Sequence, residues 1–143
     1  MKILITADVH GNLDLLDKIK ESYDLHIDAG DIVTPEHILD VKGIISVRGN
    51  CDHYSKLPME RLLNYDNKTF LVLHGHNFDV KYGLERLINY AKMKKADYCI
   101  FGHTHIQSLF IEDNITFINP GALINKPLEY AIYEDGKITL KKE

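Results

Sequence analysis

The sequence has little of what marks a disulfide-rich, membrane or modular protein. It contains only two cysteines among 143 residues, Cys51 and Cys99, with no recognisable secretory leader, so we expect a cytoplasmic protein with reduced thiols. No apolar run approaches the roughly 18 residues that a membrane span requires, so we expect no membrane partner. The chain also lacks linkers, repeats and low-complexity stretches, which predicts a single domain over residues 1–143.

Positive charge is not in excess either. The chain has 17 Lys and Arg against 21 Asp and Glu, for a net charge of −4 with His neutral. Because duplex nucleic acid is bound through many Lys and Arg contacts to phosphate, we expect no broad nucleic-acid surface. A small anionic substrate held by metal ions is compatible with this charge. Histidine is unusually frequent, with 8 in the chain, mostly in short clusters with Asp, Gly or Asn.

Hydrophobic patterning predicts alternating strands and helices in the first third of the chain, followed by a β-rich tail. Such an alternation implies an α/β fold with parallel strands and right-handed crossovers. Helices are expected over about 12–21 with Asn12 as the cap, from Thr34 as the cap with Pro35 at the first helical position, and over about 81–95. The expected strands cover residues 2–7, 23–29, 43–47, 60–65, 69–73, 97–101, 106–111, 115–118, 129–133 and 137–141.

Five of the expected strands end in residues that can bind a metal ion. Ligand sites of open α/β sheets form at the carboxyl ends of strands, so these residues are expected to meet at one edge. Ordinary Gly-Asp and Gly-Asn turns explain any one of these clusters, but they do not explain all five in this order. The strand ends carry Asp8 with His10, Asp31, Asn50, His74, and His103 with His105.

The ordered motifs Asp-x-His, Gly-Asp, Gly-Asn-x-Asp, His-Gly-His and Gly-His-x-His span residues 8 to 105. This set resembles the calcineurin-like metallophosphoesterases, above all their small cap-less phosphodiesterase branch of bacteria and archaea. The resemblance implies two packed mixed β-sheets flanked by helices, an αββα sandwich with metals at one edge. It also implies a dimetal-dependent phosphodiesterase that hydrolyses a small phosphodiester by means of a metal-bridging hydroxide.

The resemblance further implies which side chains hold two divalent metal ions. Imidazole and carboxylate ligands favour Mn or Ni over Mg, with Fe or Zn also suitable. The implied catalytic residues are Asp31, Asn50 and His76. The first ion is implied to be held by Asp8, His10, Asp31 and His105, and the second by Asp31, Asn50, His74 and His103, with Asp31 bridging both.

One position departs from the family pattern. Many relatives have His directly after the Asn, where it is thought to protonate the leaving group, whereas this chain has Cys51. A thiol with a pKa of about 8.5 is a weak substitute for imidazole, so Cys51 is interpreted as a packing residue or a weak acid. His53 and His76 are the candidates to supply the proton instead. Asp52, which would orient the missing His, is expected to pair with Arg48.

Gly11 and Asn12 lie directly behind the first two candidate ligands. We considered that one of their backbone N–H groups donates to a phosphate oxygen of the substrate. The sequence leaves this role open.

Alternative functions share much of this pattern. A phosphomonoesterase would use the same metals and differ in how the leaving group is protonated. A protein-interaction scaffold like the retromer subunit of this fold is a second alternative, but that relative has a damaged ligand set, whereas this chain keeps all seven candidate ligands. An exposed strand in the tail would allow a homo-oligomer, and the sequence does not name the natural substrate.

Overall fold

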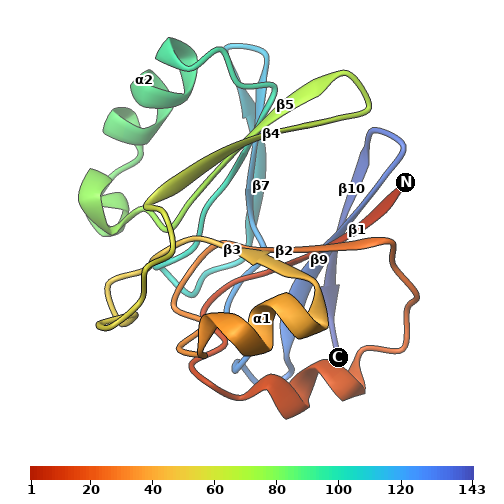
Figure 1. The fold of residues 1–143 in the computed structure, drawn as a ribbon. Coiled ribbons are helices and arrows are strands. Elements are labelled where there is room, and N and C mark those ends of the chain that lie inside the picture. Colours follow the sequence, from red (N-terminus) through yellow and green to blue (C-terminus); the bar gives the residue numbers. More distant parts are fainter.

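The computed structural model describes residues 1–143 and contains two mixed five-stranded sheets (Figure 1). Sheet A has the order β10-β9-β1-β2-β3, in which β1, β2 and β3 are parallel. Its remaining two strands add on antiparallel at one side. The strands of sheet A are β1 (Lys2–Thr6), β2 (Leu25–Asp28), β3 (Ile44–Ser46), β9 (Glu129–Glu134) and β10 (Lys137–Lys142).

Sheet B has the order β4-β5-β6-β8-β7 and the same mixed character. Its central strands β5, β6 and β8 are parallel, and β4 and β7 pair antiparallel at the two edges. Its strands are β4 (Glu60–Tyr65), β5 (Lys68–Leu73), β6 (Tyr98–Ile100), β7 (Ser108–Glu112) and β8 (Ile115–Asn119). The parallel strands of both sheets supply the strand ends that carry the candidate ligands.

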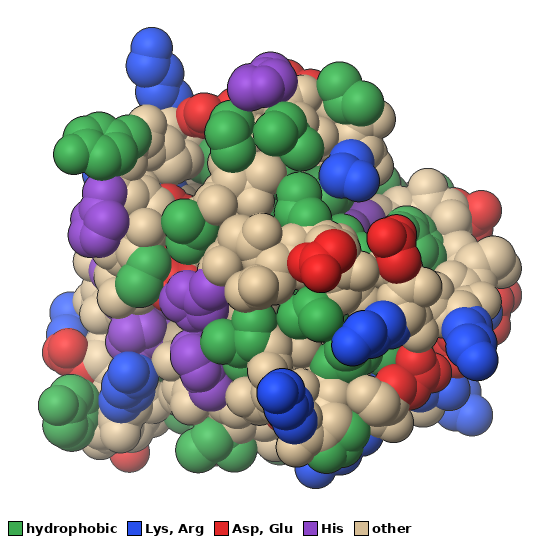
Figure 2. All heavy atoms as spheres, turned by 90° about the horizontal axis from the view of Figure 1, so that it is seen from below, with side chains coloured by type: hydrophobic (Ala, Val, Ile, Leu, Met, Phe, Trp, Pro, Cys, Tyr) green, Lys and Arg blue, Asp and Glu red, His purple; other side chains and the backbone are tan.

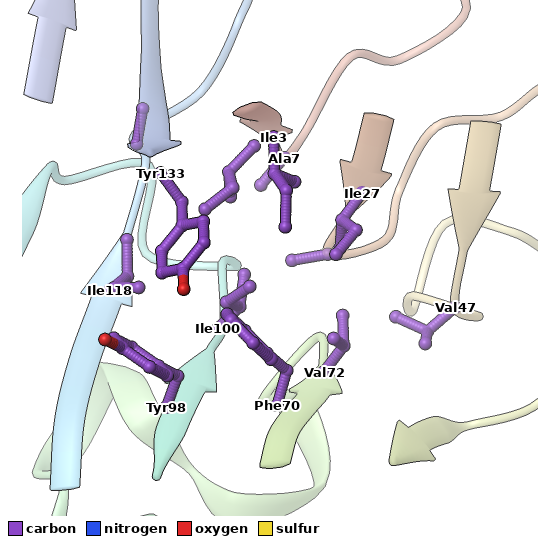
Figure 3. Packing of buried hydrophobic residues seen from close by; sticks show 13 residues of the cluster. Ile3, Ala7, Ile27, Val47, Phe70, Val72, Tyr98, Ile100, Ile118 and Tyr133 are labelled. Atoms are coloured by element: carbon purple, nitrogen blue, oxygen red, sulfur yellow. The ribbon is translucent and has the colours of Figure 1, made fainter. Parts of the chain in front are cut away.

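The two sheets pack face to face on an apolar core (Figure 3). Phe70 stacks on Tyr98 with ring centroids 4.7 Å apart, and Tyr133 from sheet A meets the Phe70 ring edge-on at 5.2 Å. Such aromatic pairs add stabilisation beyond the area that they bury. This core fixes sheet A against sheet B and therefore fixes their strand ends relative to one another.

Helices cover the outer face of each sheet. On sheet A, the 3₁₀ helix η1 (Leu13–Lys18) and α1 (Glu36–Lys42) pack on a cluster that includes Leu4 and Leu39. On sheet B, α2 (Glu85–Met93) buries Leu87 and Ala91. The short 3₁₀ helices η2 (His76–Phe78) and η3 (Val80–Tyr82) precede α2. The predicted αββα sandwich is therefore confirmed, and none of its helices has the length and apolarity to cross a membrane.

Two helix predictions near the amino terminus were wrong in detail. The segment predicted over 12–21 forms only the six-residue η1, and the Asn12 side chain does not cap it but donates to the carbonyls of Val9 and His10. Thr34 does not cap α1, because its hydroxyl donates to the carbonyl of Ile32. In both cases the side chain that was expected to cap the helix donates to a backbone carbonyl of the preceding loop instead.

The helix predicted over 81–95 is also shorter than expected. Gly83 has a φ of +135°, which is incompatible with a continuous helix, so α2 begins only at Glu85. The preceding residues form η3 instead. Between β5 and α2 the chain therefore contains only the two short 3₁₀ helices η2 and η3.

Sheet A contains a buried polar network beside the strand ends. Thr6 donates from its hydroxyl to Asp28 at 2.7 Å, so the same oxygen accepts from the Nε2 of His26, also at 2.7 Å. Asp28 further accepts from the Ser46 hydroxyl and the Gly30 N–H. Burial raises the pKa of Asp28 to about 7, although the hydrogen bonds from these donors lower it. Burial also lowers the pKa of His26 to about 4. Asp28 therefore holds a proton in the folded protein at mildly acidic pH.

Asp28→Asn is expected to remove a pH dependence of stability. The contribution of this carboxyl to the free energy of unfolding is complete below pH 3.8 and is lost as the pH rises through about 7, because the folded state holds the proton longer. Between about pH 4 and pH 8 the wild type should lose on the order of 2–4 kcal/mol relative to the variant in urea unfolding. His26 is present in both proteins, so its opposite dependence cancels, and parallel stability curves would contradict the prediction.

Candidate metal centre

The loops that follow β1, β2, β3, β5 and β6 converge at one edge shared by the two sheets. On one face of the molecule, histidine side chains gather beside hydrophobic ones (Figure 2). Many of the candidate ligands have left-handed backbone, which costs a non-glycine residue free energy and clusters at functional sites in proteins. The φ angles are +53° for Asp8, +50° for His10, +56° for Asp31, +72° for His103 and +61° for His105. The fold therefore maintains strain at these five positions.

Potential ligand atoms form three overlapping groups, and within each group they lie no more than 4.8 Å apart. Asp31 belongs to the group that contains His10 and also to the group that contains His74, so its carboxylate lies between them. Asn50 is exposed, and its side-chain amide donates to the Sγ of Cys51 at 3.7 Å. The groups are Asp8 with His10 and His105, His10 with Asp31 and Cys51, and Asp31 with His74 and His103.

The ring of His74 is held in one orientation by the backbone. Its Nδ1 lies 2.8 Å from the carbonyl oxygen of Ala29, which can only accept, so Nδ1 carries the hydrogen. The Nε2 then points at Asp31 Oδ2 at 3.2 Å and at Asp8 Oδ1 at 3.7 Å. Burial would lower the pKa of His74, but Asp31 and Asp8 raise it above its usual value. This position between two carboxylates favours a positive charge, either a proton or a metal ion.

Two buried atoms of the candidate ligands have no hydrogen-bond partner. They are Asp8 Oδ1 and His10 Nε2. Buried polar atoms in proteins almost always have a partner, and unpaired ones point to an ion or a function. Burial raises the pKa of Asp8 despite the nearby His74 and His105. Carboxylate and imidazole are suitable ligands for divalent transition metals, so these side chains fit such ions.

Asp52 is the residue whose role the sequence did not reveal. Its buried carboxylate accepts from the backbone N–H groups of Asp31 at 2.9 Å, Gly49 at 2.7 Å and Val33 at 2.8 Å. The predicted pairing with Arg48 is wrong, because the guanidinium of Arg48 donates to the carbonyl of His53 instead. Asp52 thus joins the loop after β2 to the loop after β3 and fixes the backbone that carries Asp31.

Close packing at two glycines allows the loops to approach each other. A Cβ at Gly49 would overlap the carboxylate of Asp31, and a Cβ at Gly102 would lie 2.9 Å from the Cβ of Ala7 and 3.0 Å from Asp8 Oδ2. Real Cβ atoms do not tolerate contacts of this length with backbone-anchored groups. Glycine is therefore required at both positions for the site to form.

The loop that carries His103 and His105 is anchored by two asparagines. Asn119, which is fully buried, donates to the carbonyl of Gly102 and to the hydroxyl of Thr104. Asn125 donates to the carbonyl of His105 at 3.0 Å. The sequence offers Asn119 only as part of Asn-Pro-Gly, which indicates a turn and not an anchor.

Cys51 lies against the central carboxylate. Its N–H donates to Asp31 Oδ1 at 2.7 Å. Burial and the charge of Asp31 raise the pKa of its thiol, so the thiol is protonated. By contrast, Asp31 has its pKa raised by burial but lowered more by His74 and by the Cys51 N–H, and it ends well below its usual value. Asp31 is therefore the permanent negative charge of the site.

The two histidines considered as proton sources lie in different surroundings. His76 is half-buried, with its ring centroid 5.5 Å from that of His74, and its Nδ1 is buried without a partner. Burial, followed by the charge of His74, lowers its pKa. His53 is exposed and contributes only its carbonyl to a hydrogen bond. His76 is thus the better placed of the two.

The backbone of Gly11 and Asn12 does not supply a donor to the site. The Gly11 N–H donates to the carbonyl of Ile32 at 2.8 Å, and the Asn12 N–H donates to the carbonyl of Val9 at 3.1 Å. Both groups are used to hold the loop that follows β1. The suggested phosphate contact is therefore wrong.

Comparison with known proteins agrees with this architecture. The model of the calcineurin-like phosphoesterase superfamily domain matches residues 1–134. The probable metallophosphoesterase YsnB of Bacillus subtilis (strain 168) is 31% identical over 140 residues, which cover 92% of this chain and 83% of YsnB. The phosphodiesterase YfcE of Escherichia coli (strain K12) is 25% identical over 86% of this chain and 79% of its own.

A solved structure shows the same fold over nearly the whole chain. It is a conserved protein of Streptococcus pneumoniae TIGR4, described as a predicted phosphoesterase, with a TM-score of 0.85 at 25% identity. The match covers 99% of this chain and 88% of that one. The converging histidines and carboxylates, the fold and the family match lead to one conclusion: the chain belongs to the calcineurin-like phosphoesterase superfamily and is a metal-dependent phosphoesterase.

Proposed function

We propose that the chain is a phosphodiesterase that hydrolyses small phosphodiesters with two divalent ions. The observation that carries the proposal is the His74 Nε2, which points between the buried carboxylates of Asp31 and Asp8 while its Nδ1 donates to Ala29. A cation between these groups relieves their repulsion. We assign one ion to Asp8, His10, Asp31 and His105, and the other to Asp31, Asn50, His74 and His103.

When bound, two such ions supply an acidified water as the nucleophile and neutralise charge on the phosphate oxygens. The protein's contribution is to hold Asp31 between the two ligand groups, with its backbone fixed by Asp52. Ala29 orients His74 through a hydrogen bond of the kind that typically fixes metal-binding histidines. We assign to His76, whose ring lies beside that of His74, a hydrogen bond to the ester.

Several finer assignments rest on the sequence. Manganese or nickel is the proposed ion, because imidazole-rich sites favour later first-row metals over Mg. We propose a cytoplasmic enzyme that acts as one domain over residues 1–143. The preference for diesters over monoesters is supported by the likeness to the relative named a phosphodiesterase and by the thiol at position 51, which is a weak proton donor.

Metal content should depend on Asp31 more than on His10. Wild type is expected to bind two divalent ions per chain, to lose activity with chelator and to regain it best with Mn or Ni. Asp31→Asn should lose both ions and at least about 10²-fold in activity, whereas His10→Asn weakens only one site. Elemental analysis and anomalous scattering measure this. Two fully occupied ions in Asp31→Asn would refute the shared ligand, and a protein that binds no ion and cleaves no ester would favour the scaffold function.

Asp52→Asn should weaken metal binding without touching an ion. An amide places an NH2 group where one of the two accepting oxygens of Asp52 lies, so at least one backbone N–H loses its partner, at about 1–3 kcal/mol of stability. The loosened Asp31 backbone should lower metal affinity by about 10–100-fold in calorimetric titration. The matched control is Asp113→Asn, whose exposed carboxylate pairs only with Lys92. Equal metal affinity in both variants would show that Asp52 does not position Asp31.

Cys51→His should selectively raise kcat/KM for esters with poor leaving groups. An aryl leaving group departs with little help, whereas an alkyl group needs a proton donor, and general acid catalysis contributes about 10²–10⁴-fold. We therefore expect a shallower dependence of log kcat/KM on leaving-group pKa in Cys51→His than in wild type. Equal slopes in the two proteins would mean that another group, such as His76, already supplies the proton.

A further inference from the structure

Two depressions flank the candidate ligands, and their charges differ. One has a volume of about 120 Å³ and is lined by His74, His76 and the carboxylate-bearing Glu60. The other has a volume of about 280 Å³ and is lined by Lys81 and Thr104 together with apolar side chains. The carboxylate of Glu60 is already paired with Tyr90 and Lys94, whereas Lys81 has no ion-pair partner and attracts an anionic phosphate ester, so the second depression is the more suitable for it.

The larger depression, which we call the Ile106 pocket, has apolar walls. Val80, Leu84, Phe101 and Ile106 line it, and Lys81 and Thr104 supply its polar groups. Phe101 is 1% exposed and gives a rigid wall, whereas Ile106 is 69% exposed although it is large and apolar. A ring that packs between Ile106 and Phe101 would remove apolar surface of Ile106 from water.

The pocket is joined to the candidate metal centre through the chain itself. Thr104 lies between His103 and His105, and its hydroxyl accepts from Asn119 at 2.9 Å and from the Ile106 N–H at 3.1 Å. The same short loop therefore positions two candidate ligands and Ile106. Lys81 lines the same depression as Thr104, the residue between these two histidines.

We propose that the Ile106 pocket binds a flat apolar ring on the phosphodiester, while its phosphate lies between the ion ligands and the ammonium group of Lys81. The inference rests on the proposed phosphodiesterase function and specifies its substrate class as an ester that carries an aromatic group. Pockets for whole small molecules usually enclose about 300–1,000 Å³, so about 280 Å³ is suited to one ring system. Val80 and Lys81, which line this pocket, belong to η3 and are separated from α2 by Gly83.

The test uses phenyl phosphate and methyl phosphate as monoester probes of the pocket, which share the phosphate group and carry a phenyl ring and a methyl group, respectively. Isothermal titration of the manganese-loaded full chain should show phenyl phosphate binding about 10-fold tighter than methyl phosphate, because the ring buries apolar surface. Ile106→Ser should reduce this preference about three- to tenfold. Lys81→Gln should weaken both ligands by a similar factor of about 3–10, because it acts on the phosphate.

The matched control is Ile111→Ser. Ile111 is 73% exposed, lies in the edge strand β7 of sheet B and does not line the pocket. Its preference for phenyl phosphate should equal that of wild type. No preference in wild type, or the same preference in Ile106→Ser and Ile111→Ser, would overturn the pocket while diester hydrolysis persists. If wild type binds neither ester and hydrolyses no diester, the phosphodiesterase function itself fails.

Discussion

The carboxylates of Asp8 and Asp31 meet the imidazole of His74 where the parallel strands of the two sheets end. The rest of the site depends on this convergence. Asp8 and Asp31 lie 3.7 Å and 3.2 Å from the Nε2 of His74, whose other nitrogen donates to Ala29. Such an arrangement is unfavourable without a positive charge in its centre. It persists because the apolar core between the two sheets holds the strand ends together.

Much of the surrounding structure maintains this arrangement. Five of the candidate ligands have left-handed backbone, and loops held in that way need external hydrogen bonds. Asp52 supplies one set by accepting three backbone N–H groups, and Asn119 supplies another beneath the loop that carries His103. Gly49 and Gly102 allow the contact distances that any side chain would prevent. The hydrogen bonds made by Asp52 and Asn119 thus compensate for the backbone strain at the candidate ligands.

The chemistry beside the ligands divides between two sides of the site. On one side, the Cys51 N–H donates to Asp31, and burial together with the charge of Asp31 raises the pKa of the Cys51 thiol. On the other side, the Ile106 pocket offers apolar walls and Lys81. Esters that combine a ring with a good leaving group suit both features, since the ring supplies binding and the leaving group needs no acid.

The sequence by itself determined the family, the αββα fold and the convergence of most candidate ligands, because these depend on local patterns: apolar strands, each followed by a short polar motif. It failed where a side chain acts on residues distant along the chain. Asp52 looked like a partner for nearby Arg48, yet its acceptors are used by Asp31 and Val33, about twenty residues earlier. The Ile106 pocket and the early start predicted for α2 likewise depended on how loops pack. Only the tertiary structure decides such contacts, because hydrogen-bond partners and cavities depend on distances between segments that the sequence does not order in space.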